Sequence, residues 1–230
     1  MDYLTQHFDR VWPLLIQHVQ ITGLTLGIAL LIALPLGLLV SRVRVLSTPV
    51  LGLLGIIYTI PSLALFALMI PFLGLGTTTA VVALVAYSQF ALVRNVAVAF
   101  NGLDPAVLEA ARGVGITPRQ VLWQVEAPLA LPIVLAGVRI ATLVIISLAT
   151  IAAWIGAGGL GYLLLNGVSQ DHPSEVIAGV ICVTGMALVA DTVFRLLERR
   201  VGAYRFPSRA AGRRDEPVVE EAAATAAEHL

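Results

Sequence analysis

The chain has 230 residues, of which 58% are hydrophobic and only 12% are charged, and its formal net charge is zero. The charged fraction is about half that of a soluble domain, which excludes an ordinary soluble protein and predicts an all-α membrane protein. The sequence contains no lysine, and all 14 of its cationic side chains are arginines. Since a phosphate-binding P-loop needs a lysine, ATP hydrolysis by a P-loop of this sequence is excluded.

Long runs without charge predict the membrane-spanning helices. The run from Val45 to Val93 is long enough for two spans of about 20 residues, and the stretch PFLGLGTTT from Pro71 to Thr79 divides it. We predict five spans, at residues 19–40, 50–70, 78–98, 131–153 and 176–197. Pro35 and Pro61 lie inside the first two spans, where we expect them to bend the helices. Gly23 and Gly27 have the spacing of a close contact between helices.

The arginines predict the orientation. They follow the first span (Arg42, Arg44), the third (Arg94, Arg112, Arg119) and the fifth (seven arginines from Arg195 to Arg214), and only Arg10 lies on the other side. The positive-inside rule then predicts an N-terminus outside the cell and a C-terminus in the cytoplasm. We expect an extracytoplasmic segment at residues 1–18, a transmembrane domain at 19–206 and a disordered cytoplasmic tail at 207–230, which lacks large apolar residues.

A polar loop at residues 104–128 separates the third and fourth predicted spans. Asp104 is a helix N-cap followed by Pro105, and Gly115 is placed to end that helix in the left-handed conformation. Thr117 and Gln120 form a capping box around a second helix, which we expect to end at Pro128. The sequence therefore predicts a helix, a glycine elbow and a second helix on the cytoplasmic face.

The first of these helices has a stripe of small apolar residues along one face. Glu109 and Arg112 lie beside the stripe, which consists of Val107, Ala110, Ala111 and Val114. A stripe of alanines is too shallow for a core, and it suits the close approach of another protein. A helix lying on lipid headgroups is the alternative.

The same residues carry a known motif. Glu109-Ala110-Ala111, three residues, Gly115, nine residues, Val125, one residue and Ala127-Pro128 resemble the EAA loop of ATP-binding-cassette (ABC) importer permeases, with Val125 and Ala127 in place of Ile and Leu. The stretches TIPSLALFALMIPFLGLGT and IAAWIGAGGLGYLLLNG extend the resemblance to osmoprotectant importers for glycine betaine, carnitine, choline and related quaternary amines, over roughly residues 18–200. Methionine-importer permeases share the five-span plan and IGAGGLG, so methionine or another amino acid is the alternative solute.

This resemblance implies a type I ABC importer permease fold in a bacterial plasma or inner membrane, with the polar loop as the coupling helix that docks into a separate ATPase. The implied coupling residues are Glu109, Ala110, Ala111, Gly115, Thr117, Pro118 and Pro128. The implied partners are two ATPase copies, a second permease that is identical or paralogous, an extracytoplasmic substrate-binding protein and membrane lipid, but no nucleic acid. ATP and Mg belong to the ATPase, and this chain is expected to be non-catalytic and to bind no cofactor or metal.

Two further groups of residues are candidates for the transport route. Aromatic faces hold quaternary ammonium groups, and the aromatic candidates for lining the path are Tyr58, Phe66, Tyr87 and Phe90. The alternative for these side chains is packing. The candidates for a gate or a subunit contact are the glycines of GAGGLG: Gly156, Gly158, Gly159 and Gly161. The four histidines are scattered, without a second metal ligand at a useful spacing.

A secondary transporter and a membrane scaffold without transport are the other hypotheses. Secondary transporters usually carry ionisable residues at mid-membrane, and we place only Arg139 and Asp191 inside the predicted spans. Asp191 is expected to pair with Arg195 four residues later, and Arg139 to extend toward the cytoplasm or face a partner helix. Solute transport in vesicles with and without ATP would separate the three hypotheses.

Overall fold

The computed structural model describes residue 3 and residues 6–203, and within this part of the chain it is helical throughout, without strands. The predicted tail at 207–230 lies outside the described residues. The helices are α2 (Phe8–Arg42), α3 (Arg44–Thr59), α4 (Ser62–Leu73), α5 (Thr77–Asn101), α6 (Pro105–Gly113), α7 (Pro118–Gln120), the π-helix η1 (Val121–Glu126), α8 (Ala127–Ile151), the 3-10 helix η2 (Ala152–Ile155), α9 (Gly161–Ser169) and α10 (Pro173–Ala203).

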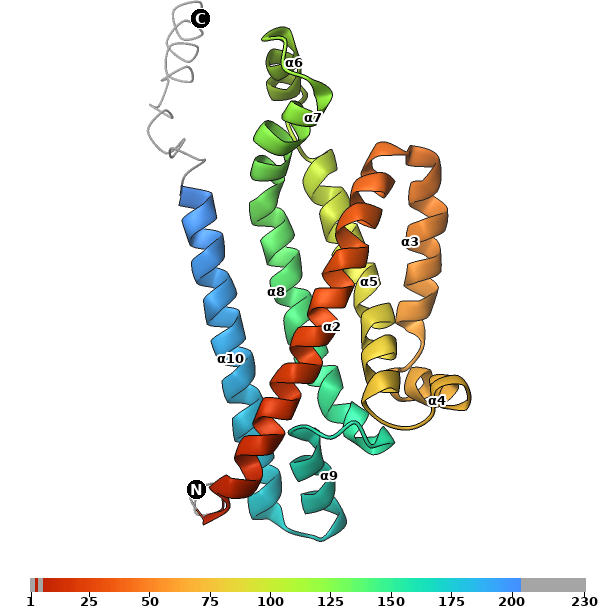
Figure 1. Cartoon of the computed structure of the whole chain (residues 1–230), viewed down its shortest axis with the longest axis vertical. Coiled ribbons are helices and arrows are strands. Elements are labelled where there is room, and N and C mark those ends of the chain that lie inside the picture. Colours follow the sequence, from red (N-terminus) through yellow and green to blue (C-terminus); the bar gives the residue numbers. More distant parts are fainter. Residues whose placement is uncertain (1–2, 4–5, 204–230) are drawn as a thin grey trace, which may run out of the picture.

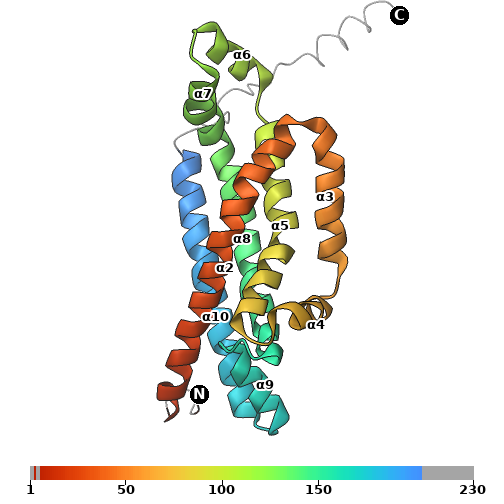
Figure 2. The ribbon, with the colours of Figure 1, turned by 45° about the vertical axis from the view of Figure 1, so that its right-hand side comes forward.

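The long helices α2, α5, α8 and α10 run along the length of the molecule (Figures 1 and 2), and α5 packs against both α2 and α8. In the described residues, four helical segments are long and apolar enough to cross a membrane, and the bent pair of α3 and α4 brings the number to five. The predicted all-α membrane fold is confirmed.

The first span is longer than predicted. Helix α2 begins at Phe8, so residues 8–18, expected in a separate segment, are part of the helix. Asp9 and Arg10 end the uncharged run without ending the helix, because charged side chains in the first turns of a helix lie at the surface. A charge-free run therefore marks the apolar part of this helix and not its start.

The second span is broken. The axes of α3 and α4 differ by 98°, so a single helix over residues 50–70 is wrong. Pro61 has no N–H for a helical hydrogen bond, and Ile60 before it is extended, with φ −67° and ψ 127°. The bend expected at Pro61 is thus confirmed, whereas α2 continues past Pro35 as one helix.

The third span is close to its predicted bounds, but one arginine lies elsewhere. Gly74 and Gly76, both with positive φ, separate α4 from α5 as expected. Arg94, expected to follow the third span, lies inside α5, seven residues before its end at Asn101. The predicted bounds of 78–98 already contain residue 94, so the bounds were right and the assignment of Arg94 to the following loop was wrong.

Two glycines allow close packing of the central helices. A Cβ atom at Gly37 of α2 would lie 2.5 Å from Cβ of Val96, and one at Gly137 of α8 would lie 2.5 Å from Cβ of Asn95. Gly23 and Gly27, which have the spacing of a close helix contact, are exposed, and a Cβ atom at either would have no neighbour within 4 Å. The close crossings within this chain therefore use other glycines.

The two ends of the helix bundle differ. One end, called the α6 end here, carries α6, α7 and the last turns of α2 and α10. The opposite end, called the α9 end, carries α9, the start of α2 and the glycine-rich loop at residues 156–161 (Figure 1). These two ends contain most of the residues that the sequence singles out.

Candidate functional site

Helix α6 is built by local interactions. The Asp104 side chain accepts a hydrogen bond from the Ala106 amide at 2.9 Å, and Pro105 occupies the first helical position. Gly115 has φ +83°, a left-handed conformation in which a residue with a Cβ atom is strained. The cap at Asp104 and the elbow at Gly115 are confirmed.

The helix after the elbow begins as predicted but ends elsewhere. The Thr117 amide donates to Oε1 of Gln120 at 2.8 Å, and the Gln120 amide donates back to Oγ1 of Thr117 at 3.4 Å. This capping box opens a helical segment that runs from Pro118 to Ile155, so Pro128 does not end it. Pro128 lies in the first turn of α8, where the preceding π-helix makes the loss of one N–H tolerable.

Six of the seven predicted coupling residues lie together at the α6 end: Glu109, Ala110, Ala111, Gly115, Thr117 and Pro118. Pro128 lies ten residues beyond Pro118, which is about 15 Å along a helix. No residue of α6 is buried, and the Val114 side chain beside the elbow is 82% exposed. The small apolar stripe of α6 is therefore not part of this chain's core.

An ion pair that the sequence analysis missed connects this region to the first span. Arg42, the last residue of α2, is bonded to the carboxylate of Glu126, the last residue of η1. The Glu126 side chain is 3% exposed and the Arg42 side chain 46% exposed. A single acidic residue in the apolar run VLWQVEAPLALP was the available signal, because a buried carboxylate needs a partner.

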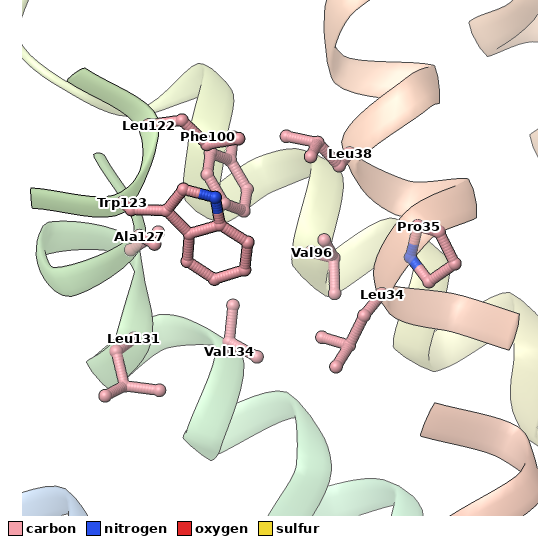
Figure 3. A pocket seen from close by; sticks show the side chains of 11 residues that line it. Leu34, Pro35, Leu38, Val96, Phe100, Leu122, Trp123, Ala127, Leu131 and Val134 are labelled. Carbon is pink, nitrogen blue, oxygen red and sulfur yellow. The ribbon is translucent and has the colours of Figure 1, made fainter. Parts of the chain in front are cut away.

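An apolar cavity of about 370 Å³ lies beneath this ion pair, between α2, α5 and the start of α8. The Trp123 ring covers one side of it, with Val134 below the ring, and Leu34, Leu38 and Val96 lie on the opposite side (Figure 3). None of its lining side chains is charged. This cavity can accommodate apolar groups but offers nothing to bind a polar solute.

Three of the four aromatic candidates form a cluster between α3 and α5. The Tyr58 ring lies 4.9 Å from the Tyr87 ring and 5.3 Å from the Phe90 ring, measured between centroids. Phe66 on α4 is instead fully buried in the core. The cluster borders a cavity of about 390 Å³, which Arg94 and Asn95 also line.

At the α9 end, α2 binds the glycine-rich loop through two adjacent side chains. Gln17 accepts a hydrogen bond from the Gly159 amide at 2.9 Å and donates to the Ala157 carbonyl at 3.3 Å. Nδ1 of His18 accepts from the Leu160 amide at 3.2 Å, and Nε2 lies 3.2 Å from the Ile146 carbonyl. Because Nδ1 accepts, the proton of this buried, neutral imidazole must be on Nε2.

Contacts within the chain account for three of the four candidate glycines. A Cβ atom would lie 2.4 Å from the Gln17 side chain at Gly158, 2.9 Å from His18 at Gly159, and 2.1 Å from the Thr150 carbonyl oxygen at Gly161. Gly156 has a positive φ but open space around it. A gate or subunit contact at these glycines stays a prediction.

Four charged side chains of α8 and α10 form ion pairs with one another. Arg195 bonds Asp191 at 2.7 Å, as predicted, and Arg139 lies 3.7 Å from Asp191 and 3.3 Å from Glu198. Arg139 thus faces a neighbouring helix of its own chain. Between residues 6 and 203, no three His, Cys, Asp or Glu side chains are grouped to hold a metal ion.

Comparison with protein families identifies the chain. The family described as binding-protein-dependent transport system inner membrane component matches residues 25–203, which include all of the long helices except residues 8–24 of α2. The chain belongs to this family. Membership in this permease family establishes that the chain is a multi-pass membrane subunit of a transport system. The exposed helix α6 and the glycine-rich loop both lie within the matched residues.

Characterised members of the permease family are similar along most of the chain. The osmoprotectant import permease protein OsmW of Salmonella typhimurium is 42% identical over 203 residues, which cover 86% of this chain and 94% of that protein. The choline transport system permease protein OpuBB of Bacillus subtilis is 37% identical over 185 residues, covering 80% and 85%. The carnitine transport permease protein OpuCB of Listeria monocytogenes is 37% identical over 187 residues, with the same coverage.

Solved structures share the fold at lower identity. A chain of the methionine ABC transporter MetNI in an inward-facing conformation gives a TM-score of 0.76 at 21% identity, covering 87% of this chain and 98% of that chain. A chain of an amino acid ABC transporter with histidines gives 0.72 at 21% identity, covering 86% and 96%. The fold is that of the type I ABC importer permeases.

Proposed function

We propose that the chain imports small quaternary amines, namely glycine betaine, choline, carnitine or a related osmoprotectant, as the membrane subunit of an ATP-driven importer. The names of relatives at 37–42% identity support this solute class. The methionine and amino acid transporters resemble the chain at 21% identity, which supports a common fold and not a common solute.

The proposed orientation places the α6 end in the cytoplasm. Arg42, Arg44, Arg112 and Arg119 lie at that end, together with the arginines of the last turns of α10, whereas among the described residues Arg10 lies near the α9 end. Positively charged residues are retained on the cytoplasmic side during membrane insertion. The N-terminus is then outside the cell and the end of α10 inside.

Helix α6 is the proposed docking element for an ATPase subunit, and its exposure is the observation that carries the proposal. The helix is capped by its own residues and contacts η1, but no residue of it is buried, and Val107, Ala110 and Val114 of its small apolar stripe are exposed to a partner. Ala110 and Ala111 permit close approach, Gly115 provides the turn, and Glu109 at the edge of the stripe offers a charge to a cation of the partner.

The complete importer would contain two ATPase subunits, which bind ATP and Mg, a second permease that is identical or paralogous, and a substrate-binding protein at the α9 end. This chain would bind no cofactor and hydrolyse no ATP, since the sequence lacks the lysine of a P-loop. The purified chain should therefore show no ATPase activity until the ATPase subunit is added.

A charge reversal at Glu109 tests the docking role. In vesicles containing the complete importer, Glu109→Arg should abolish uptake of radiolabelled glycine betaine and weaken co-purification of the ATPase, because like charges across a partly desolvated contact cost several kcal/mol. Asp9→Arg, which reverses an exposed acid at the opposite end, is the matched control and should transport normally. A reversed charge on the ATPase should rescue Glu109→Arg.

Normal uptake by Glu109→Arg would mean that α6 lies on lipid headgroups and docks no partner. Uptake that continues without ATP would favour a secondary transporter. If none of the three amines is taken up, the proposed solute class is contradicted.

A further inference from the structure

Arg94 is a cation inside a membrane-spanning helix. It precedes the end of α5 by seven residues, which places its Cα about 10 Å inside the helix end. Unlike Arg139, which two carboxylates neutralise, Arg94 has no carboxylate within salt-bridge distance among the residues that the structure describes. The Arg94 side chain is exposed on α5. Charged residues within membrane-spanning helices extend to the interface or face a water-filled cavity or a partner, and those that face a cavity commonly mark a solute pathway.

The surroundings of Arg94 form a site of suitable size. The cavity between α3 and α5 has a volume of about 390 Å³, within the range of small-molecule sites, and is lined by Tyr58, Phe90, Ala91, Arg94, Asn95 and Val98. Asn95 is held in place, since its Nδ2 donates to the Ala91 carbonyl at 2.7 Å and its side chain packs where Gly137 of α8 leaves room. The second N–H of this amide is available to a ligand.

Aromatic rings stand directly beside the cation. The Arg94 guanidinium carbon lies 5.9 Å from the centre of the Phe90 ring, and Tyr58, which is 39% exposed, lies against both Phe90 and Tyr87. Aromatic faces attract quaternary ammonium groups, and a guanidinium binds carboxylates. The cavity thus presents a site for a cation next to a site for an anion.

We propose that this cavity binds zwitterionic solutes during transport, with Arg94 and the Asn95 amide holding the carboxylate and the rings of Tyr58 and Phe90 holding the quaternary ammonium. This inference rests on the proposed function, and it adds a selectivity determinant within the permease itself. Glycine betaine and carnitine carry both groups, whereas choline has the ammonium group without a carboxylate. Arg94 should therefore discriminate between solutes that share the same cation.

The proposal is tested by measuring uptake by the complete importer in vesicles. Radiolabelled glycine betaine and radiolabelled choline are compared with the same binding protein, each at a concentration that saturates it. Arg94→Gln should lower glycine betaine uptake at least about tenfold, because the substitution removes one hydrogen bond to the charged carboxylate. Choline uptake should stay within about twofold of the unsubstituted importer, since choline has no carboxylate. Tyr58→Leu should instead lower uptake of both solutes, because both present the same ammonium group.

Matched controls separate these effects from general damage. Arg44→Gln removes an exposed arginine at the start of α3, and Phe72→Leu removes an exposed ring on α4, and both should leave the two uptake rates unchanged. If Arg94→Gln lowers the uptake of both solutes equally, as expected if Arg94 binds a lipid phosphate or supports folding, the proposal is overturned. It is also overturned if Arg94→Gln leaves the uptake of both solutes unchanged. If the unsubstituted importer transports neither solute, the proposed function itself fails.

Discussion

The two ends of this permease are built in opposite ways. At the α6 end the hydrogen bonds that shape the elbow join residues two or three positions apart, and no residue of α6 is buried within the part of the chain that the structure describes. At the α9 end Gln17 and His18 bind a loop 142 positions away in the sequence, and the loop's backbone lies directly against α2 and α8. One end is preformed and free to dock a partner, whereas the other is completed by its own chain.

The largest expected effect is at the α9 end. Gly161→Ala would place a methyl group 2.1 Å from the Thr150 carbonyl oxygen, a backbone atom that cannot move away without disrupting α8. We expect little folded protein, measured as the yield of monodisperse permease in detergent and its thermal unfolding. Gly156→Ala is the control, since it has open space and only the strain of its left-handed backbone, about 1 kcal/mol. Equal unfolding temperatures for the two variants would contradict this account of the loop.

The second effect concerns the ion pair that connects the α6 end to the first span. Arg42→Ala leaves a buried, uncompensated carboxylate at Glu126 and should lower the free energy of unfolding by about 3–5 kcal/mol. Glu126→Gln leaves only the half-exposed Arg42, which water can solvate, so its cost should be less than about half of that. The double variant should be more stable than Arg42→Ala alone. If the two single variants lose the same free energy of unfolding, the buried Glu126 carboxylate depends on the pair no more than the half-exposed Arg42 does, which would contradict this account.

A smaller loss of stability is expected when the glycine-rich loop loses one hydrogen-bond acceptor on α2. His18→Leu leaves the buried Leu160 amide without its hydrogen-bond partner, which should lower the free energy of unfolding by about 1–3 kcal/mol. Thr22→Val one turn further along α2 is the control, because the Thr22 hydroxyl donates only to carbonyls of its own helix. A control that is as damaging as His18→Leu would argue against a specific role of the imidazole in holding the loop.

The smallest effect on stability, with a clear effect on transport, is expected at the elbow. Thr117→Ala removes the capping box, which costs the local helix about 1 kcal/mol, but the global unfolding temperature should not change because this segment is exposed. ATP-driven uptake should fall as α6 loses its fixed direction. Thr192→Ala, whose hydroxyl donates to its own helix on the surface of α10, should change neither quantity.

The same contrast explains what the sequence could predict. The caps at Asp104 and Thr117 and the elbow at Gly115 depend on neighbouring residues, so local patterns identify them. The bond of Arg42 to Glu126 joins residues 84 positions apart, and the bond of His18 to Leu160 depends on where the glycine-rich loop meets α2, 142 positions away in the sequence. The predicted bounds of the third span contain Arg94, but the sequence gives no sign of the cavity between α3 and α5 that this side chain lines.

Hydrogen–deuterium exchange of the α6 segment tests the central claim most directly. In the isolated permease the amides of residues 106–115 should exchange rapidly, because the helix is short and none of its residues is buried. Addition of the ATPase subunit should slow their exchange strongly, while the Gly159 and Leu160 amides, already bonded within the chain, should be slow in both samples. Unchanged exchange in α6 in the presence of a bound ATPase would contradict the claim that this end of the permease is the docking site.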